Sequence, residues 1–178
     1  YDEIFKPLGI ENDMFIGIPD GFEHRIAFLE DYRDELNNLT MPEITAIPQA
    51  LWPLHRWMNT KIGQSSCVPG GSGIMTAKAL ARHYASLLPG GVDGIELLPP
   101  GRVKLACESV PESPKWRMGY TFPESRASSF GHLGHGDSVG LADPEQNLAF
   151  AAAKNKFGSP DFVKNALKII RDELGLTS

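Results

Sequence analysis

Residues 128–175 alternate short apolar runs with turns and then end in one amphipathic segment. The apolar runs lie at 128–134, 138–144 and 148–156, and their length and alternation are those of β-strands. The sequence DPEQN, residues 143–147, joins the last two runs, and its Asp, Pro and Asn are common in turns. Short strands that follow one another through turns predict an antiparallel sheet with a hairpin.

The closing segment, SPDFVKNALKIIRDELG at 159–175, predicts a helix. Ser159 is a cap, Pro160 takes the first helical position, and Asp161 complements the helix dipole. Gly175 follows the last apolar residue and ends the helix. One wide apolar face is formed by Phe162, Val163, Ala166, Leu167, Ile170 and Leu174. Such a helix needs a packing partner, and we expect the sheet just before it to be that partner.

Two further helices are predicted upstream. The clearer one covers 76–88, with Thr76 as its N-cap and Gly90 after its end. A shorter one follows at 101–110, and the aromatic run WRMGYTF at 116–122 suits another strand. Helices and sequential antiparallel strands together predict an α+β fold.

The first part of the chain is less regular. Prolines recur from 11 to 73, and the periodic stretches between them are short, so we expect this region to be irregular. The opening residues YDEIF predict the last turns of a helix without a cap ahead of it, stopped by Pro7 and Gly9. A chain that starts inside a helix suggests that a first half is missing.

Composition excludes several classes of protein. With 178 residues and 42% hydrophobic side chains the chain can bury a core, and its net charge of −5, with scattered Lys and Arg, disfavours a nucleic-acid surface. Cys67 and Cys107 lack the spacing of a zinc site or disulfide framework. No apolar run is as long as a membrane span and no signal peptide is visible, so the compartment stays open, with the cytoplasm as the default.

The sequence FGHLGHGDSVG at 130–140 has the highest density of functional residue types. A metal site would use His132, His135 and Asp137, but residues three apart face opposite sides of a strand, and so many glycines disfavour a helix. We therefore expect no metal and no cofactor. A structural alternative makes His132 a hydrogen-bonded strand residue and the glycines turn or bulge positions.

Other conspicuous side chains receive structural interpretations. His83 is expected on the exposed side of the helix at 76–88, because Leu80 and Tyr84 occupy its apolar side. The aromatic side chains of Trp52, His55 and Trp57 lie close together in sequence. A substrate-lining aromatic wall is one alternative, but we expect them to pack within the subdomain.

Four segments in order resemble the C-terminal motifs of the serine β-lactamase-like family: 4–10, 69–91, 116–122 and 130–156. That family includes class C β-lactamases, penicillin-binding proteins, D-aminopeptidases and esterases. The resemblance implies a central antiparallel sheet packed by helices, with a helical subdomain. It makes residues 1–178 the C-terminal portion of one such domain, in which 11–73 belong to the subdomain or loops and 74–178 to the main sheet and its helices.

The resemblance also implies a site. The family lines it with SxxK, which holds the nucleophile, with YxN, and with a KTG or HxG triplet on a strand. His132, Leu133 and Gly134 match the triplet, whereas SxxK and YxN do not occur in the chain. We therefore expect a partner segment, the N-terminal half, to carry those two motifs, and we expect the chain alone to be inactive.

The implied roles follow acyl transfer. The backbone N–H of His135 would be one of two donors to the oxyanion, and His132 would bind a substrate carboxylate or assist the acid/base tyrosine. Leu133 and Gly134 would border the acyl group. Asp137 and the His135 side chain would either narrow the pocket or pair with each other. A histidine where β-lactamases have lysine favours an ester, amide or peptide-like substrate over a β-lactam.

Two alternatives remain at this stage. A β-lactamase-like binding or scaffold module could keep the fold without the chemistry, because fold does not fix function. If instead the resemblance is accidental, an ordinary α+β domain should have a closed core. The hydrolase interpretation predicts an exposed sheet edge and apolar surface where the missing half docks.

Overall fold

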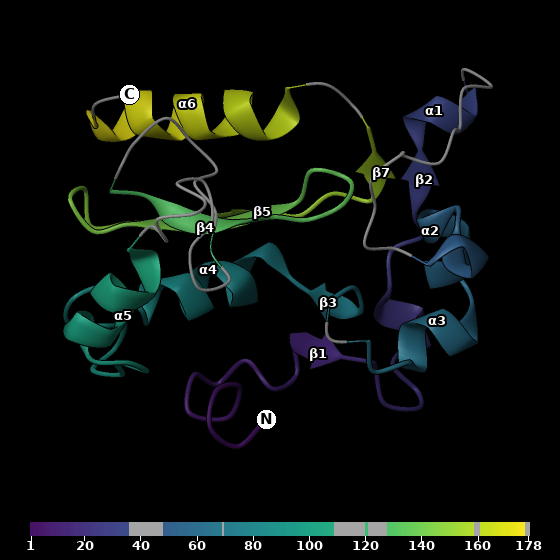
Figure 1. Cartoon of the computed structure of the whole chain (residues 1–178), viewed down its shortest axis with the longest axis horizontal. Coiled ribbons are helices and arrows are strands. Elements are labelled where there is room, and N and C mark those ends of the chain that lie inside the picture. Colours follow the sequence, from purple (N-terminus) through teal and green to yellow (C-terminus); the bar gives the residue numbers. More distant parts are fainter. Residues whose placement is uncertain (36–47, 69, 109–119, 121–127, 159–160, 177–178) are drawn as a thin grey trace.

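The computed structural model describes residues 1–35, 48–68, 70–108, 120, 128–158 and 161–176. Its main body has three layers, with a sheet between one helix, α6, and two others, α4 and α5 (Figure 1). A second region of short helices and strands lies beside one end of this sheet. The α+β fold class with antiparallel strands is confirmed.

The main sheet contains β4 (Phe130–Leu133), β5 (Val139–Asp143) and β6 (Leu148–Ala152), antiparallel and in that order. The hairpin predicted at 143–147 joins β5 to β6, and the Asp143 carboxylate accepts a hydrogen bond from the Glu145 N–H at 3.1 Å. All five residues of β5 are buried, because helices cover both of its faces.

Helix α4 (Ala77–Ala85) covers one face of this sheet. The Thr76 hydroxyl caps it by accepting a hydrogen bond from the Ala79 N–H at 3.1 Å, as its sequence predicts. Helix α5 (Pro100–Cys107) contributes Val103 to the same core. That core also contains Tyr84, Leu87, Leu88, Phe130 and Ala142.

His83 is not on an exposed face of α4, contrary to the sequence-based prediction. Burial lowers the pKa of its imidazole, and its buried Nδ1 has no hydrogen-bond partner in the described parts of the chain. Helix α4 is covered on two sides, since Tyr84 faces the sheet while Ala79 packs with Leu8 of the N-terminal segment. A helix covered on two sides has little exposed surface left, which the apolar pattern of one face did not reveal.

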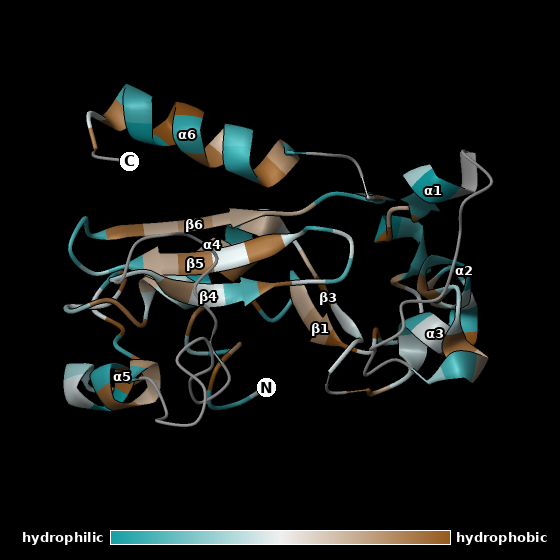
Figure 2. Cartoon of the chain, turned by 45° about the horizontal axis from the view of Figure 1, so that its top comes forward, coloured by the Kyte–Doolittle hydropathy of each residue, from teal (hydrophilic) through white to brown (hydrophobic). Residues whose placement is uncertain are grey.

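Helix α6 (Phe162–Leu174) packs on the opposite face of the sheet, as predicted. Its hydrophobic and hydrophilic residues alternate in bands, while β5 and β6 are mostly hydrophobic (Figure 2). Leu167 is buried against the sheet, and Gly175 ends the helix with φ 67°. Ser159 and Pro160 lie outside the described residues, and Asp161 is the N-cap without a side-chain capping hydrogen bond.

The region predicted to be irregular contains short elements instead. Strand β1 (Met14–Ile16) pairs antiparallel with β3 (Gly73–Met75), and β2 (Glu30–Asp31) pairs in parallel with β7 (Lys156–Phe157). The short helices here are α1 (Tyr32–Glu35), α2 (Leu54–Met58), α3 (Lys61–Ser65) and the 3-10 turns Glu23–Arg25 and Gln49–Leu51. Elements of two to five residues leave too few repeats for a periodic sequence signal.

The remaining predictions concern the chain's start and the aromatic run at 116–122. The opening residues form hydrogen-bonded turns rather than a full helix, and the Phe5 N–H donates to the Tyr1 carbonyl at 3.0 Å. The strand predicted at 116–122 lies outside the described residues, apart from Tyr120. In the described ranges no helix has the length and apolarity needed to cross a bilayer.

Candidate active site

Strand β4 ends in an exposed turn that contains most of the predicted site residues. His132 and Leu133, the last residues of β4, are exposed, and the chain then reverses direction through residues 134–137. The Gly134 N–H donates to the Ser138 carbonyl at 2.7 Å, which closes the turn. Positive φ values of 95° at Gly136 and 70° at Asp137 make the reversal tight.

Two close contacts lie behind the turn. Gly140 of β5 is paired with His132, and a Cβ at Gly140 would stand 2.3 Å from Cε2 of Tyr84, so only glycine fits there. Burial raises the pKa of the Tyr84 hydroxyl, while a hydrogen bond with the backbone of His132 acts in the opposite direction. The Tyr84 hydroxyl therefore stays protonated at physiological pH. The Tyr84 side chain packs against the face of the sheet that α4 covers, next to β4.

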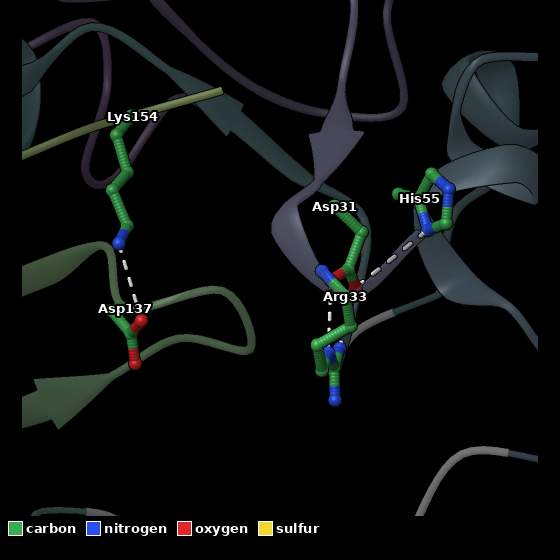
Figure 3. A network of polar contacts seen from close by, with 5 residues as sticks. All are labelled: Asp31, Arg33, His55, Asp137 and Lys154. Carbon is green, nitrogen blue, oxygen red and sulfur yellow. Dashed lines mark hydrogen bonds and ion pairs between the residues drawn. The ribbon is translucent and has the colours of Figure 1, made fainter. Parts of the chain in front are cut away.

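A salt bridge ties the far side of the turn to the chain after β6. Lys154 Nζ lies 3.2 Å from Asp137 Oδ2 (Figure 3), and the Lys154 side chain is 9% exposed, against 56% for Asp137. The Lys154 N–H also donates to the Ser138 hydroxyl at 3.2 Å. The cation of Lys154 is thus already paired with a carboxylate at the edge of the site.

The His135 ring packs edge-on between two aromatic side chains. Its centroid lies 5.9 Å from that of Trp52 and 5.6 Å from that of Phe157, at interplanar angles of 77° and 85°. Partial burial first, and then the nearby Arg33 cation, lower the pKa of His135. The imidazole is therefore neutral at physiological pH.

Asp31, Arg33 and His55 form a polar network (Figure 3) that touches the same two aromatic side chains, Trp52 and Phe157. The Asp31 side chain is 1% exposed, and its carboxylate accepts two hydrogen bonds from the Arg33 guanidinium, from Nε at 2.9 Å and from Nη2 at 2.5 Å. His55 Nδ1 lies 3.9 Å from the same carboxylate. Hydrogen bonds from the Arg33 guanidinium hold the pKa of Asp31 below its usual range. The Arg33 cation also lies over the Trp52 ring at 5.8 Å.

The main-chain pairing joins this network to the turn. Asp31 of β2 is the register partner of Phe157 in β7, and the Phe157 ring contacts both His55 and His135. Sequence reasoning missed Asp31 and Arg33 as neighbours of the site. No local pattern could have found them, because the contact depends on a parallel pairing between residues far apart in the chain.

A cavity of about 420 Å³ adjoins the same network. It is lined by Phe28, Leu29, Glu30, Asp31, His55, Arg56 and Asn59. The predicted site residues at 132–137 do not line it, whereas Asp31 and His55 of the network do.

The structure thus gathers all five predicted site residues at one end of the sheet. Gly134, His135 and Asp137 form the turn, with His132 and Leu133 directly before it. Trp52, expected to pack within the subdomain, with a substrate-lining wall as the alternative, contacts this turn through the His135 ring. Within the described residues, no three His, Cys, Asp or Glu side chains are grouped as metal ligands.

Comparison with known proteins gives consistent matches. The family model described as Beta-lactamase matches residues 1–174. The chain is 34% identical over 105 residues to the protein named Esterase/beta-lactamase LipL of Mycobacterium tuberculosis (strain ATCC 25618 / H37Rv), which covers 52% of this chain and 24% of that protein.

Solved structures share the fold. A family VIII carboxylesterase has a TM-score of 0.73 at 23% identity over 96% of this chain, and EstA from Arthrobacter nitroguajacolicus Rue61a has 0.71 at 17% over 97%. A penicillin-binding protein homologue from Caulobacter crescentus has 0.58 at 27% over 86%. The matches cover 50%, 53% and 45% of those chains, so this chain spans about half of their length.

Proposed function

Because the chain belongs to the Beta-lactamase family, we propose that it is the C-terminal part of a serine hydrolase that acts on an ester, amide or peptide-like substrate through an acyl-enzyme. In that reaction a serine oxygen attacks the carbonyl carbon, and the leaving group departs with a proton. Water then attacks the acyl-enzyme and releases the acid. The serine and the acid/base tyrosine would come from the N-terminal half of the protein, and this chain would supply the strand that faces them.

One observation carries the proposal: the HxG triplet ends an exposed strand and is followed by an available backbone donor. The N–H of His135 makes no hydrogen bond to any residue that the structure describes. A donor that is already held in place and unpaired is what a developing oxyanion requires. We assign to this N–H half of the oxyanion hole.

The residues before this donor would contact the substrate. Gly134 has an open neighbourhood, in which an added Cβ would approach only the Ser138 carbonyl, at 3.4 Å, and its side chain at 4.0 Å. The acyl group would lie along this glycine and the exposed Leu133, while His132 would bind a substrate oxygen or the acid/base tyrosine. Asp137, held by Lys154, would border the pocket.

The pairing of Arg33 and Lys154 with carboxylates supports an ester substrate over an anionic substrate that would need an unpaired cation to bind it. Arg33 is paired with Asp31 and Lys154 with Asp137, so each cation near the turn is next to a carboxylate. His135 is neutral at physiological pH, as argued from its lowered pKa.

The test uses the full-length protein from which these 178 residues come. A fluorophosphonate probe should label one serine outside this chain, and a p-nitrophenyl ester should be hydrolysed. Changing His135→Pro removes the N–H without removing the strand, and should lower kcat by about 10²- to 10³-fold, the usual cost of one oxyanion donor. His135→Ala, which also loses the imidazole and its contacts with Trp52 and Phe157 but keeps the backbone N–H, is the matched control; His24→Ala is a second control at an exposed histidine.

Two results would contradict the proposal. An unlabelled protein without SxxK and YxN upstream would be a binding or scaffold module that has kept the fold. A labelled and active enzyme in which His135→Pro retains full kcat would show that the second donor lies elsewhere.

A further inference from the structure

We propose that Phe157 is a positioning residue of this active site: its ring holds the turn at 134–137 in the conformation that presents the His135 N–H to the substrate. This inference rests on the proposed function, since it concerns the same oxyanion donor. Phe157 lies outside the HxG motif, in β7, and touches neither nucleophile nor substrate in the proposal.

The contact with the turn is close. A Cβ built on Gly136 would stand 2.2 Å from Cδ1 and 2.5 Å from Cε1 of Phe157, so the ring lies directly against the backbone of the turn. Gly136 also has φ 95°, a conformation that residues with side chains rarely adopt. Ring and glycine therefore fit only as a pair, and the ring blocks the turn from shifting toward β7.

The donor residue is held by its own side chain as well. Phe157 packs edge-on against the His135 ring at a centroid distance of 5.6 Å, and Trp52 packs against the same ring at 5.9 Å. Such edge-to-face pairs are favourable beyond the area they bury. The backbone at 135 and 136 is thus fixed by one aromatic ring through two adjacent residues.

Phe157 is itself well fixed. It is 5% exposed, the centroid of its ring lies 6.4 Å from that of the His55 ring, and its backbone pairs with that of Asp31. The Asp31 carboxylate, which is 1% exposed, accepts hydrogen bonds from Arg33 two residues further along, so this ion pair fixes the local conformation of β2. The parallel pairing then joins β2 to the strand that carries Phe157, whose buried ring lies against the oxyanion turn.

Positioning of this kind affects the rate more than substrate binding. An oxyanion exists only near the transition state, so a displaced donor weakens the transition state and leaves the ground state nearly unchanged. Misplacement by about 1 Å can cost about 10²-fold in rate. Loss of the Phe157 ring should therefore lower kcat by about 10- to 100-fold with little change in KM.

The experiment compares Phe157→Leu with Phe150→Leu in the full-length protein. Phe150 is a buried phenylalanine of β6 that packs toward α6, so its replacement costs packing without touching the turn. Three quantities are measured: kcat and KM for a p-nitrophenyl ester, thermal stability, and hydrogen exchange of peptides that cover 131–138. We expect Phe157→Leu to lower kcat and speed exchange at the turn, and Phe150→Leu to lower only the thermal stability.

The outcomes separate the two proposals. If wild type is labelled and active, but Phe157→Leu keeps the kcat and turn exchange of Phe150→Leu, the positioning role is wrong and the proposed function stands. If wild type neither reacts with the fluorophosphonate probe nor hydrolyses esters, the proposed function fails, and the positioning role with it. Should Phe157→Leu fail to fold, Phe157→Met, whose flexible side chain adapts to an irregular space, is judged by the same readouts.

Discussion

Gly136 and Gly90 both adopt positive φ values, but only one of them meets another side chain. Gly136 has φ 95° and faces the Phe157 ring, whereas Gly90 has φ 85° and open space around its missing Cβ. The two positions thus share the conformation that favours glycine, and steric exclusion by a neighbouring side chain belongs to Gly136 alone. Comparing the two glycines therefore isolates the effect of the Phe157 ring on the turn after β4.

We predict that Gly136→Ala destabilises the full-length protein more than Gly90→Ala does. Both changes incur strain of about 1–3 kcal/mol, and Gly136→Ala adds a clash with a buried ring that cannot easily move. The free energy of unfolding, measured by urea denaturation, compares them. Equal losses for the two variants would mean that the ring yields and does not hold the turn.

His83 gives a pH-dependent prediction at the same scale. Its ring is buried without a partner for Nδ1 within the described residues, and burial lowers its pKa in the folded state. The unfolded chain then binds more protons as the pH falls through about 6.5, so stability should drop there on acidification. The drop should be smaller in His83→Leu, and the difference between the two unfolding curves from pH 7.5 to 5 measures it.

His135 also titrates with a lowered pKa, so the two histidines must be separated. Subtracting the His83→Leu curve from the wild-type curve removes the His135 contribution, because both proteins keep that residue. Parallel curves would assign the acid sensitivity to other groups and contradict the burial of His83.

The secondary-structure elements divide into those that a local pattern predicts and those that it cannot. Helix α4, the β5–β6 hairpin and helix α6 each contain several turns or alternations and a cap or turn signal, so their existence follows from the sequence. Strands β2 and β7 have two residues each and exist only through their pairing. The HxG triplet could be identified from the sequence because its three residues are contiguous and resemble a family motif. Its aromatic and ionic neighbours could not, because they come from segments far apart in the chain.

Helix α6 provides a matched test of packing. Leu167 is 6% exposed and contacts the sheet, whereas Ile169 on the same helix is 61% exposed. We expect Leu167→Ala to cost about 2–5 kcal/mol of unfolding free energy, and Ile169→Ala to cost less than about 0.5 kcal/mol as an exposed site. Comparable costs would indicate that Ile169 is covered in the full-length protein.

At the scale of the whole molecule, the chain is about half of the solved structures that share its fold. Among the described strands β4 and β6 lie at the two edges of the main sheet, and α6 exposes Phe162, Ile169 and Leu174. Exposed apolar side chains gathered on one helix are typical of interaction surfaces. Under the proposed function, the rest of the protein would pack against this surface of α6.

The proposed function, with an active site divided between an upstream segment and this chain, predicts that activity can be reconstituted from the two pieces. Residues 1–178 alone should not hydrolyse p-nitrophenyl esters, since they carry no SxxK and no YxN. The upstream segment alone should also be inactive, because it lacks the HxG strand and the His135 donor. Mixed or co-expressed, the two should regain ester hydrolysis and fluorophosphonate labelling of the upstream serine.

The same mixture with His135→Pro in this chain should associate but stay slow, because association buries the sheet edges whereas turnover needs the oxyanion donor. Ester hydrolysis by residues 1–178 without the partner segment would mean that a nucleophile lies within this chain, and would overturn the split of the active site between the two halves.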